Sequence, residues 1–172
     1  HRIPCWGFKL IEKKKPRKIL RNMIDKYNIP FSNIQAIKDG QHYITEKGEK
    51  ILNKKLTLDS HLPRSYAYCS DTKYFTKLSE YVSGVDILYH ESTFHSDLNE
   101  KAIVTFHSTA QNAAEVARDS KVKKLIIGHF SSRYKNLDIL KKDAEKIFKN
   151  VDLAEEGKVW QINKKYSYEN NY

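Results

Sequence analysis

The stretch Lys123-Lys-Leu-Ile-Ile-Gly-His-Phe-Ser-Ser-Arg-Tyr134 decides the fold class, because a short apolar run ends at a glycine and polar residues follow at once. A continuous apolar run between lysines and a glycine is typical of a strand covered on both faces. His129 then stands at the carboxyl end of this strand, where open α/β sheets bind ligands. Ser131, Ser132 and Arg133 add hydroxyls and a guanidinium, which suit a phosphate clamp beside a metal ligand. A surface histidine and an exposed arginine are the simpler alternative.

From residue 65 onward, strand patterns alternate with helix patterns. We expect strands at 66–69, 85–89, 124–128, 151–154 and 159–162. We also expect two helices, one that begins near residue 108 and one that covers 137–148. Ser108 and Gln111 have the spacing of a capping box, and alanines form a narrow apolar stripe behind them. The alternation predicts a layered α/β architecture.

The chain before residue 65 is basic. Lys9 to Arg64 hold 14 basic and 6 acidic residues, whereas the whole chain has a net charge of +10. We expect a strand at 8–11, helices at 20–27 and 32–38, the second capped by Ser32, and a hairpin around Gly48. With few large apolar residues for its length, 13–62 should be a protruding, basic, mobile element and not core. It would hold a polyanionic partner, unless it is only a solvated lysine-rich surface.

Length and composition set further limits. The 172 residues suffice for one domain with a core. The sequence has no run of 18 apolar residues and no signal-peptide pattern, so we expect a cytoplasmic protein without a membrane span. Cys5 and Cys69 are too few for a disulfide framework. Because the chain opens on a histidine, inside the phrase His1 to Phe8, we interpret it as a fragment.

Polar residues follow three successive strands. Asp71 follows the first, His90 and Glu91 the second and His129 the third, and His107 precedes a helix. Each alone is weak evidence, because a carboxylate after a strand is often only a turn former. The topology, however, brings these ends to one edge. Imidazoles with a carboxylate suit zinc, and two metals about 3.5–4 Å apart can clamp both reacting oxygens of a phosphodiester.

Five motifs, in the same order, resemble ribonuclease Z, the tRNA 3′-end endonuclease family of the metallo-β-lactamase superfamily. They are His1-Arg-Ile-Pro-Cys-Trp-Gly-Phe8, Ala67-Tyr-Cys-Ser-Asp-Thr72, His90-Glu-Ser-Thr-Phe94, His107-Ser-Thr109 and Gly128-His-Phe-Ser-Ser-Arg-Tyr134. The resemblance implies the carboxyl-terminal part of a metallo-β-lactamase αβ/βα sandwich with an inserted flexible arm. It divides the chain into a metal-ligand turn and strand at 1–11, a basic tRNA-binding arm at 12–64, the half-domain at 65–163 and a polar tail at 164–172.

The resemblance also implies roles for single residues. His1 and His129 would be ligands of the first and second zinc, and Asp71 would bridge the two ions. His107 and Glu91 would together protonate the leaving 3′ oxygen. Two residues would lie near the scissile phosphate, namely Ser131 and Arg133. The arm would bind tRNA through basic side chains that include Lys13, Lys14, Lys15, Arg17, Lys18 and Arg21.

The activity implied is that of a zinc-dependent endoribonuclease, a hydrolase that removes the 3′ trailer of pre-tRNA and leaves a 3′ hydroxyl. The resemblance suggests a homodimer. The family's His-x-His-x-Asp-His motif is absent from this sequence, so we expect the chain to need the upstream part of its domain and to be inactive alone. Two alternatives stay open: another phosphodiesterase of the same fold, and a non-catalytic basic RNA-binding module.

The sequence departs from the family pattern at two places. The arm reads Ile29-Pro-Phe-Ser-Asn33 where many family arms carry Gly-Pro, and Ser92 stands where alanine is usual. We expect three histidines to face solvent, namely His42, His61 and His95, and we expect Trp6 and Trp160 to serve the core.

Overall fold

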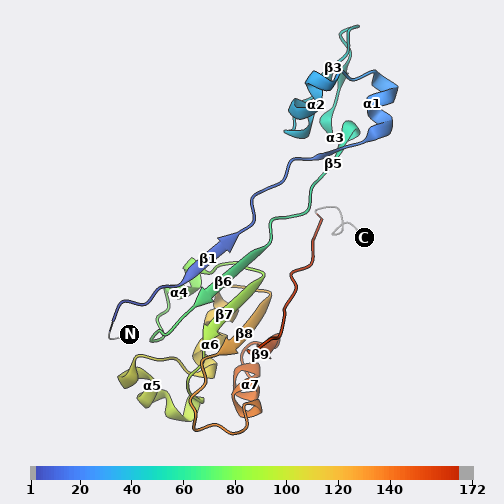
Figure 1. Ribbon diagram of the computed structural model, residues 1–172. Coiled ribbons are helices and arrows are strands. Elements are labelled where there is room, and N and C mark those ends of the chain that lie inside the picture. The colour runs from blue at the N-terminus through green and yellow to red at the C-terminus, as the bar shows by residue number, and fades with distance from the viewer. Residues whose placement is uncertain (1–2, 167–172) are drawn as a thin grey trace. The chain divides into compact units, whose positions relative to one another are not determined.

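The computed structural model describes residues 3–166, and these fall into two compact units (Figure 1). Within the described residues, one unit comprises 3–11 and 64–162 and is called the sheet unit below. The other comprises 12–63 and 163–166 and is called the basic unit. His1, the expected ligand of the first zinc, lies outside the described residues.

The sheet unit is built on a mixed sheet whose strands stand in the order β1-β6-β7-β8-β9. The strands are β1 (Phe8–Ile11), β6 (Ser65–Cys69), β7 (Ile87–Glu91), β8 (Lys124–Gly128) and β9 (Val151–Leu153). β1 is antiparallel to β6, and the other pairs are parallel. Cys69 is paired with His90, and Glu91 with Gly128. The carboxyl ends of β6, β7 and β8 therefore meet at one edge.

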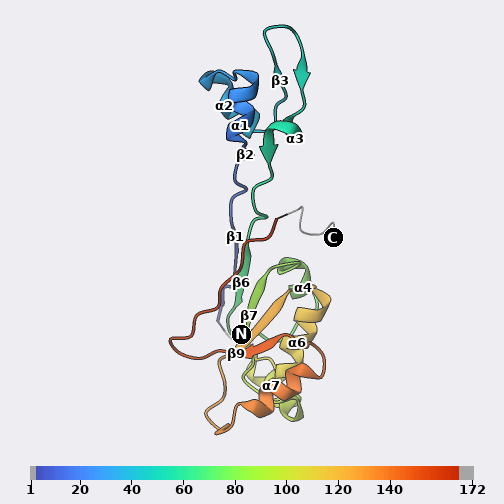
Figure 2. The same cartoon turned by 90° about the vertical axis from the view of Figure 1, so that its right-hand side faces the viewer.

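Helices cover one face of this sheet, where α6 contacts β7 and β8 and α7 contacts β9 (Figures 1 and 2). The helical elements are α4 (Leu78–Tyr81), the 3-10 turn η1 (Ser96–Leu98), α5 (Asn99–Thr105), α6 (Ala110–Asp119) and α7 (Asp138–Glu145). The alanine stripe is fully buried, which confirms that it is the packing face of α6. Small side chains let this helix lie close to the strands, against Leu88, Leu125 and Ile127.

Two details of the sheet unit differ from expectation. The capping box of α6 consists of Thr109 and Asn112. Ser108 is not the cap, and its hydroxyl instead donates to the carbonyl of Thr72, 2.7 Å away. The predicted strand at 159–162 is wrong, since these residues pair with no strand in the described structure. Instead, Trp160 Nε1 donates a hydrogen bond to Asp152 at 2.8 Å.

The basic unit contains short elements, and its predicted hairpin is confirmed by the pairing of β3 with β4. The elements are β2 (Lys18–Ile19), α1 (Arg21–Tyr27), α2 (Phe31–Lys38), β3 (Tyr43–Ile44), β4 (Lys50–Ile51), α3 (Asn53–Leu56) and β5 (Thr57–Leu58). Gly48 at the turn has φ +82°, a conformation that glycine adopts without steric cost. The predicted cap of α2 is wrong, because Pro30 precedes the helix and Ser32 lies inside it.

The expectation that 13–62 is not core is also wrong, because this segment has a small core of its own. Four apolar side chains from different elements are buried together with Ile29, which lies between α1 and α2: Ile37, Tyr43, Ile51 and Leu56. Buried Asn53 connects the elements further, because its side-chain amide donates to the carbonyls of Ile37 at 2.6 Å and Gln41 at 2.7 Å. Its own oxygen accepts from the hydroxyl of Thr57 at 2.8 Å. The basic unit therefore has a small hydrophobic centre fastened by one polar side chain.

Three residues outside the expected set of site residues were also placed wrongly. His61 is buried, and its Nδ1 lies 3.6 Å from a carboxylate oxygen of Glu12. His95 is partly buried between the carboxylates of Asp97 and Asp143. Trp6 is 73% exposed and lines a cleft rather than the core. None of the helices in the described part of the chain is long and apolar enough to cross a membrane.

Candidate functional site

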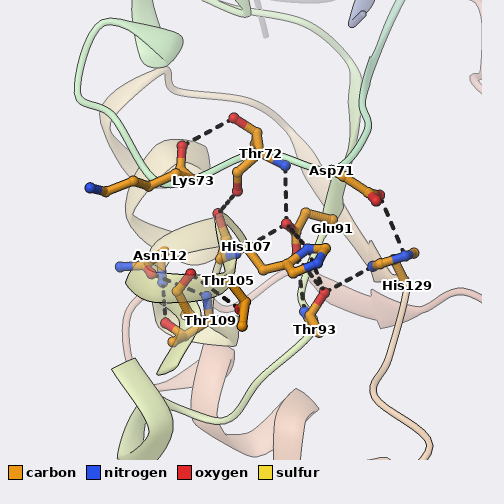
Figure 3. Close-up of polar contacts among 12 residues, drawn as sticks. Asp71, Thr72, Lys73, Glu91, Thr93, Thr105, His107, Thr109, Asn112 and His129 are labelled. Carbon is orange, nitrogen blue, oxygen red and sulfur yellow. Dashed lines mark hydrogen bonds and ion pairs between the residues drawn. The ribbon is translucent and has the colours of Figure 1, made fainter. Parts of the chain in front are cut away.

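Four of the predicted site residues meet at the sheet edge (Figure 3). Asp71 follows β6, Glu91 is the last residue of β7, and His129 follows β8. His107 comes from the turn between α5 and α6, where Phe106 at φ +61° reverses the chain direction. The alignment of parallel strand ends explains why residues so distant in sequence come together here.

Glu91 lies at the centre of the cluster, and its side chain is fully buried. One carboxylate oxygen accepts from the backbone N–H groups of Thr72 and Ser108, both at 3.1 Å, and from His107 Nδ1 at 2.9 Å. The other oxygen accepts from the backbone N–H of Thr93 at 3.1 Å and from its hydroxyl at 2.8 Å. Five donors thus satisfy a carboxylate whose burial would otherwise be strongly unfavourable.

The two site histidines stack on each other. Their ring centroids lie 5.3 Å apart with an angle of 26° between the planes. Phe94 contacts His107 edge-on at 6.2 Å, so the imidazole is held between an aromatic ring and a second imidazole. His107 is only 15% exposed, whereas His129 is 45% exposed. His107 is therefore the more rigidly held of the two.

His129 is fixed from both sides of its ring. Its Nε2 lies 3.4 Å from a carboxylate oxygen of Asp71, and its Nδ1 lies 2.8 Å from the hydroxyl of Thr93. Its backbone has φ +58°, an unfavourable conformation for a residue with a Cβ atom. Backbone hydrogen bonds hold the turn in place, from Ser92 N–H to Gly128 at 2.7 Å and from Ser131 N–H to the carbonyl of Thr93 at 3.1 Å.

The arrangement fits a divalent metal ion. Asp71, His107 and His129 each offer one ligand atom, and these atoms all lie within 4.8 Å of one another. One carboxylate oxygen and imidazole nitrogens are ligands that zinc accepts in proteins. The expected ligands Asp71 and His129 thus lie together. His107 could also bind a metal through Nε2, in addition to the acid role that the sequence suggests for it.

The two residues expected near a phosphate lie beside this cluster. Arg133 Nε donates to the hydroxyl of Ser131 at 3.0 Å, and the guanidinium carbon lies 5.0 Å from the centre of the Phe94 ring. Both side chains are accessible, so the guanidinium can contact a ligand. A cleft of about 490 Å³ opens at Asp71 and is lined also by Trp6 and Phe75.

The basic side chains predicted to bind tRNA belong to the basic unit. Five of them are exposed: Lys13, Lys14, Lys15, Lys18 and Arg21. Arg17 is engaged within the unit, because its guanidinium forms an ion pair with Asp59 and donates to Thr57 at 2.6 Å. A cavity of about 600 Å³ adjoins these residues and is lined also by Lys38 and His61. The described structure therefore gives Arg17 a structural role that the sequence did not indicate.

Sequence reasoning missed Thr93. This residue is buried and touches Glu91, His107 and His129 with one hydroxyl oxygen. The signal was present, since Thr93 belongs to the quoted motif that contains Glu91, but the motif alone did not show where the hydroxyl points. The backbone donors of Thr72 and Ser108 were missed as well, because their direction depends on the folded loops.

Comparison with known proteins identifies the relatives of this chain. It is 47% identical over 156 residues to ribonuclease Z of Bacteroides fragilis strain YCH46, which covers 91% of this chain and 51% of that protein. It is 49% identical over 156 residues to ribonuclease Z of Phocaeicola vulgatus, over 91% of this chain and 50% of the relative. The chain is a homologue of ribonuclease Z. It spans about half the length of the curated ribonuclease Z proteins it matches.

A comparison with solved structures bears on the fold alone. The metallo-beta-lactamase fold protein YhfI from Bacillus subtilis matches with a TM-score of 0.54 and 23% identity, over 57% of this chain and 40% of that chain. This likeness confirms the predicted metallo-β-lactamase fold. No family profile matches the chain.

Proposed function

We propose that the protein to which this chain belongs is a zinc-dependent endoribonuclease that removes the 3′ trailer of pre-tRNA and leaves a 3′ hydroxyl. The observation that carries the proposal is the convergence of Asp71, Glu91, His107 and His129 at one sheet edge, in a homologue of ribonuclease Z. A carboxylate and imidazoles suit a metal centre, and a buried carboxylate bonded to an imidazole suits a proton donor.

The metal site would use Asp71 and His129, together with His1 and with ligands that this sequence does not contain. Bound there, zinc would supply Lewis acidity and activate water for attack on a phosphodiester. The role of this chain's residues is to hold the metal and to orient the substrate. Arg133, supported by Phe94 and Ser131, would contact the scissile phosphate through a guanidinium that pairs well with phosphate oxygens.

Proton transfer to the leaving group would fall to His107. Its Nδ1 hydrogen is donated to Glu91 at 2.9 Å, so the imidazole keeps a fixed orientation with Nε2 on its other side. With Nδ1 bonded to Glu91, a hydrogen carried on Nε2 can be donated to the departing 3′ oxygen. Because Glu91 is held by four other donors, it cannot rotate away during the reaction.

Substrate selection would come from the basic unit. Its exposed lysines and Arg21 would contact phosphates of the tRNA, and such contacts position a nucleic acid without reading its bases. This binding should weaken steeply with salt. We further propose that the protein works in the cytoplasm as a homodimer, in which the basic unit of one subunit serves the site of the other.

The experiment compares the full-length protein with a variant that lacks residues 13–62, on a 3′-extended pre-tRNA and on a small phosphodiester. We expect the deletion to abolish pre-tRNA cleavage and to spare the small substrate. End-group analysis of the tRNA product should show a 3′ hydroxyl. If the full-length protein cleaves only the small substrate, or if the deletion leaves pre-tRNA cleavage unchanged, the proposed substrate or the proposed mode of recognition is wrong.

A further inference from the structure

The hydroxyl of Thr93 is placed between the three ionisable side chains of the site. Its oxygen lies 2.8 Å from a Glu91 oxygen, 2.8 Å from His129 Nδ1 and 3.3 Å from His107 Nδ1 (Figure 3). The side chain belongs to a residue that is only 7% exposed, so water cannot easily replace these partners. The positions of the hydrogens in this cluster therefore depend on one another.

The hydrogen of this hydroxyl can be assigned from the chemistry of its neighbours. A carboxylate only accepts hydrogen bonds, and a hydroxyl has a single hydrogen to give. If Thr93 gave this hydrogen to His129, the lone pairs of Thr93 and Glu91 would face each other at 2.8 Å in a buried site. The hydroxyl therefore donates to Glu91.

This assignment decides the tautomer of His129. With its hydrogen given to Glu91, the oxygen of Thr93 can only accept at the 2.8 Å contact with His129, so Nδ1 of His129 must carry a hydrogen. In the neutral imidazole, Nε2 is then the nitrogen with a free lone pair. That atom is the one that faces Asp71 at 3.4 Å, on the side of the proposed metal.

We propose that Thr93 is a positioning residue that carries the influence of Glu91 to His129 and presents Nε2 of His129 as the metal-binding atom. The same buried carboxylate orients His107 directly and His129 through the hydroxyl. The inference rests on the proposed function in one respect, namely that His129 binds a metal. A hydrogen bond to the second ring nitrogen is how proteins commonly fix the tautomer of a metal-binding histidine.

Two variants of the full-length protein separate the hydroxyl from the shape of the side chain. Thr93→Val keeps the branched shape and removes the hydroxyl, whereas Thr93→Ser keeps the hydroxyl. Thr105→Val is the matched control, because the hydroxyl of Thr105 bonds only within its helix, to the carbonyls of Lys101 at 2.8 Å and Ala102 at 3.5 Å. Circular dichroism would verify that each variant is folded.

The first readout is the tautomer of His129 in metal-free protein, measured from the ¹⁵N chemical shifts of its ring and assigned with a His129→Asn variant. In the metal-free site Asp71 faces Nε2, and because its carboxylate can only accept, it favours a hydrogen there. We therefore expect a hydrogen on Nδ1 in wild type, Thr93→Ser and Thr105→Val, where the Thr93 hydroxyl or its serine equivalent accepts it, and a shift to Nε2–H in Thr93→Val. An Nε2–H tautomer in folded wild type would overturn the proposal, and so would an unchanged tautomer in Thr93→Val.

The second readout is zinc affinity, measured by competition with a chromogenic chelator. We expect Thr93→Val to bind about 10–100-fold more weakly than wild type, with Thr93→Ser and Thr105→Val near wild type. Equal zinc affinity in wild type and Thr93→Val would refute the positioning role. His129→Asn tests the proposed function separately: if it binds zinc like wild type, the ligand assignment fails while the tautomer result still stands.

Discussion

His107 Nδ1 lies 2.9 Å from Oε1 of Glu91, and the carboxylate that accepts this hydrogen bond is fully buried. Glu91→Gln would replace one accepting oxygen with an amide that donates. That amide would face N–H or O–H donors on either side of the group. We expect the variant to lose about 1–3 kcal/mol of unfolding free energy, measured with urea, because buried donors lose their acceptor. Pre-tRNA cleavage should fall by about 10²–10⁴-fold.

A matched control for this substitution is Glu145→Gln. Glu145 lies near the surface and forms a loose ion pair with Lys141 at 3.8 Å. We expect a change within about 0.5 kcal/mol and normal cleavage. Similar losses in both variants would show that the burial of Glu91 has no special importance.

Gly128 leaves room for the ring of Tyr89. A Cβ atom at this position would lie 2.4 Å from the Tyr89 hydroxyl oxygen and 2.7 Å from a ring carbon. Tyr89 cannot move freely, because it stacks on Tyr68 with ring centroids 4.8 Å apart. We expect Gly128→Ala to cost about 1–3 kcal/mol of unfolding free energy. In a Tyr89→Ala background the same substitution should cost much less, and a double-mutant cycle without coupling would rule out the clash.

The pH dependence of stability should depend on Asp143. Burial of this carboxyl raises its pKa. Hydrogen bonds from the backbone and hydroxyl of Ser96 and from Lys146 lower the pKa by more than burial raises it, so the folded pKa is below the ordinary value. The ionised carboxylate of Asp143 therefore stabilises the fold fully above the unfolded pKa of about 3.9, and this stabilisation is lost as the pH falls through the folded pKa.

The test is the difference in unfolding free energy between wild type and Asp143→Asn, measured in urea at pH 7 and near pH 3. We expect the variant to be less stable at pH 7 and the difference to shrink at pH 3. A difference that is the same at both pH values would mean that the charge of Asp143 does not contribute.

The basic unit should depend on the amide of Asn53. Asn53→Ala would leave the carbonyls of Ile37 and Gln41 without this donor, at a cost of about 1–3 kcal/mol. We expect amide hydrogen exchange to accelerate in residues 18–58 and to stay normal in β6, β7 and β8. Asn33→Ala is the control, since Asn33 is exposed and its side chain accepts only a 3.3 Å bond from Ser32. Unchanged exchange in Asn53→Ala would contradict this role.

The sequence was sufficient to predict which residues meet at the site, but not the hydrogen bonds that connect them. Parallel strands end at a common edge, so apolar runs followed by Asp71, Glu91 and His129 predicted their meeting. The contacts of the Thr93 hydroxyl with Glu91, His107 and His129 were not predictable, because the direction of this hydroxyl depends on the turn after β7. The core of the basic unit was missed for a related reason. Its five apolar residues lie on four short elements and one loop, and no periodic pattern connects them.

The role of His107 distinguishes the proposed mechanism most sharply, because this residue can act as the proton donor or as a metal ligand. The measurement compares two substrates of the His107→Ala variant. One is the ordinary pre-tRNA, and the other is a pre-tRNA whose scissile 3′ oxygen is replaced by sulfur. Sulfur leaves without protonation, so we predict a loss of about 10²–10⁴-fold on the oxygen substrate and near wild-type cleavage of the sulfur substrate. An equal loss on both substrates, with weaker zinc binding, would contradict the acid role and make His107 a metal ligand.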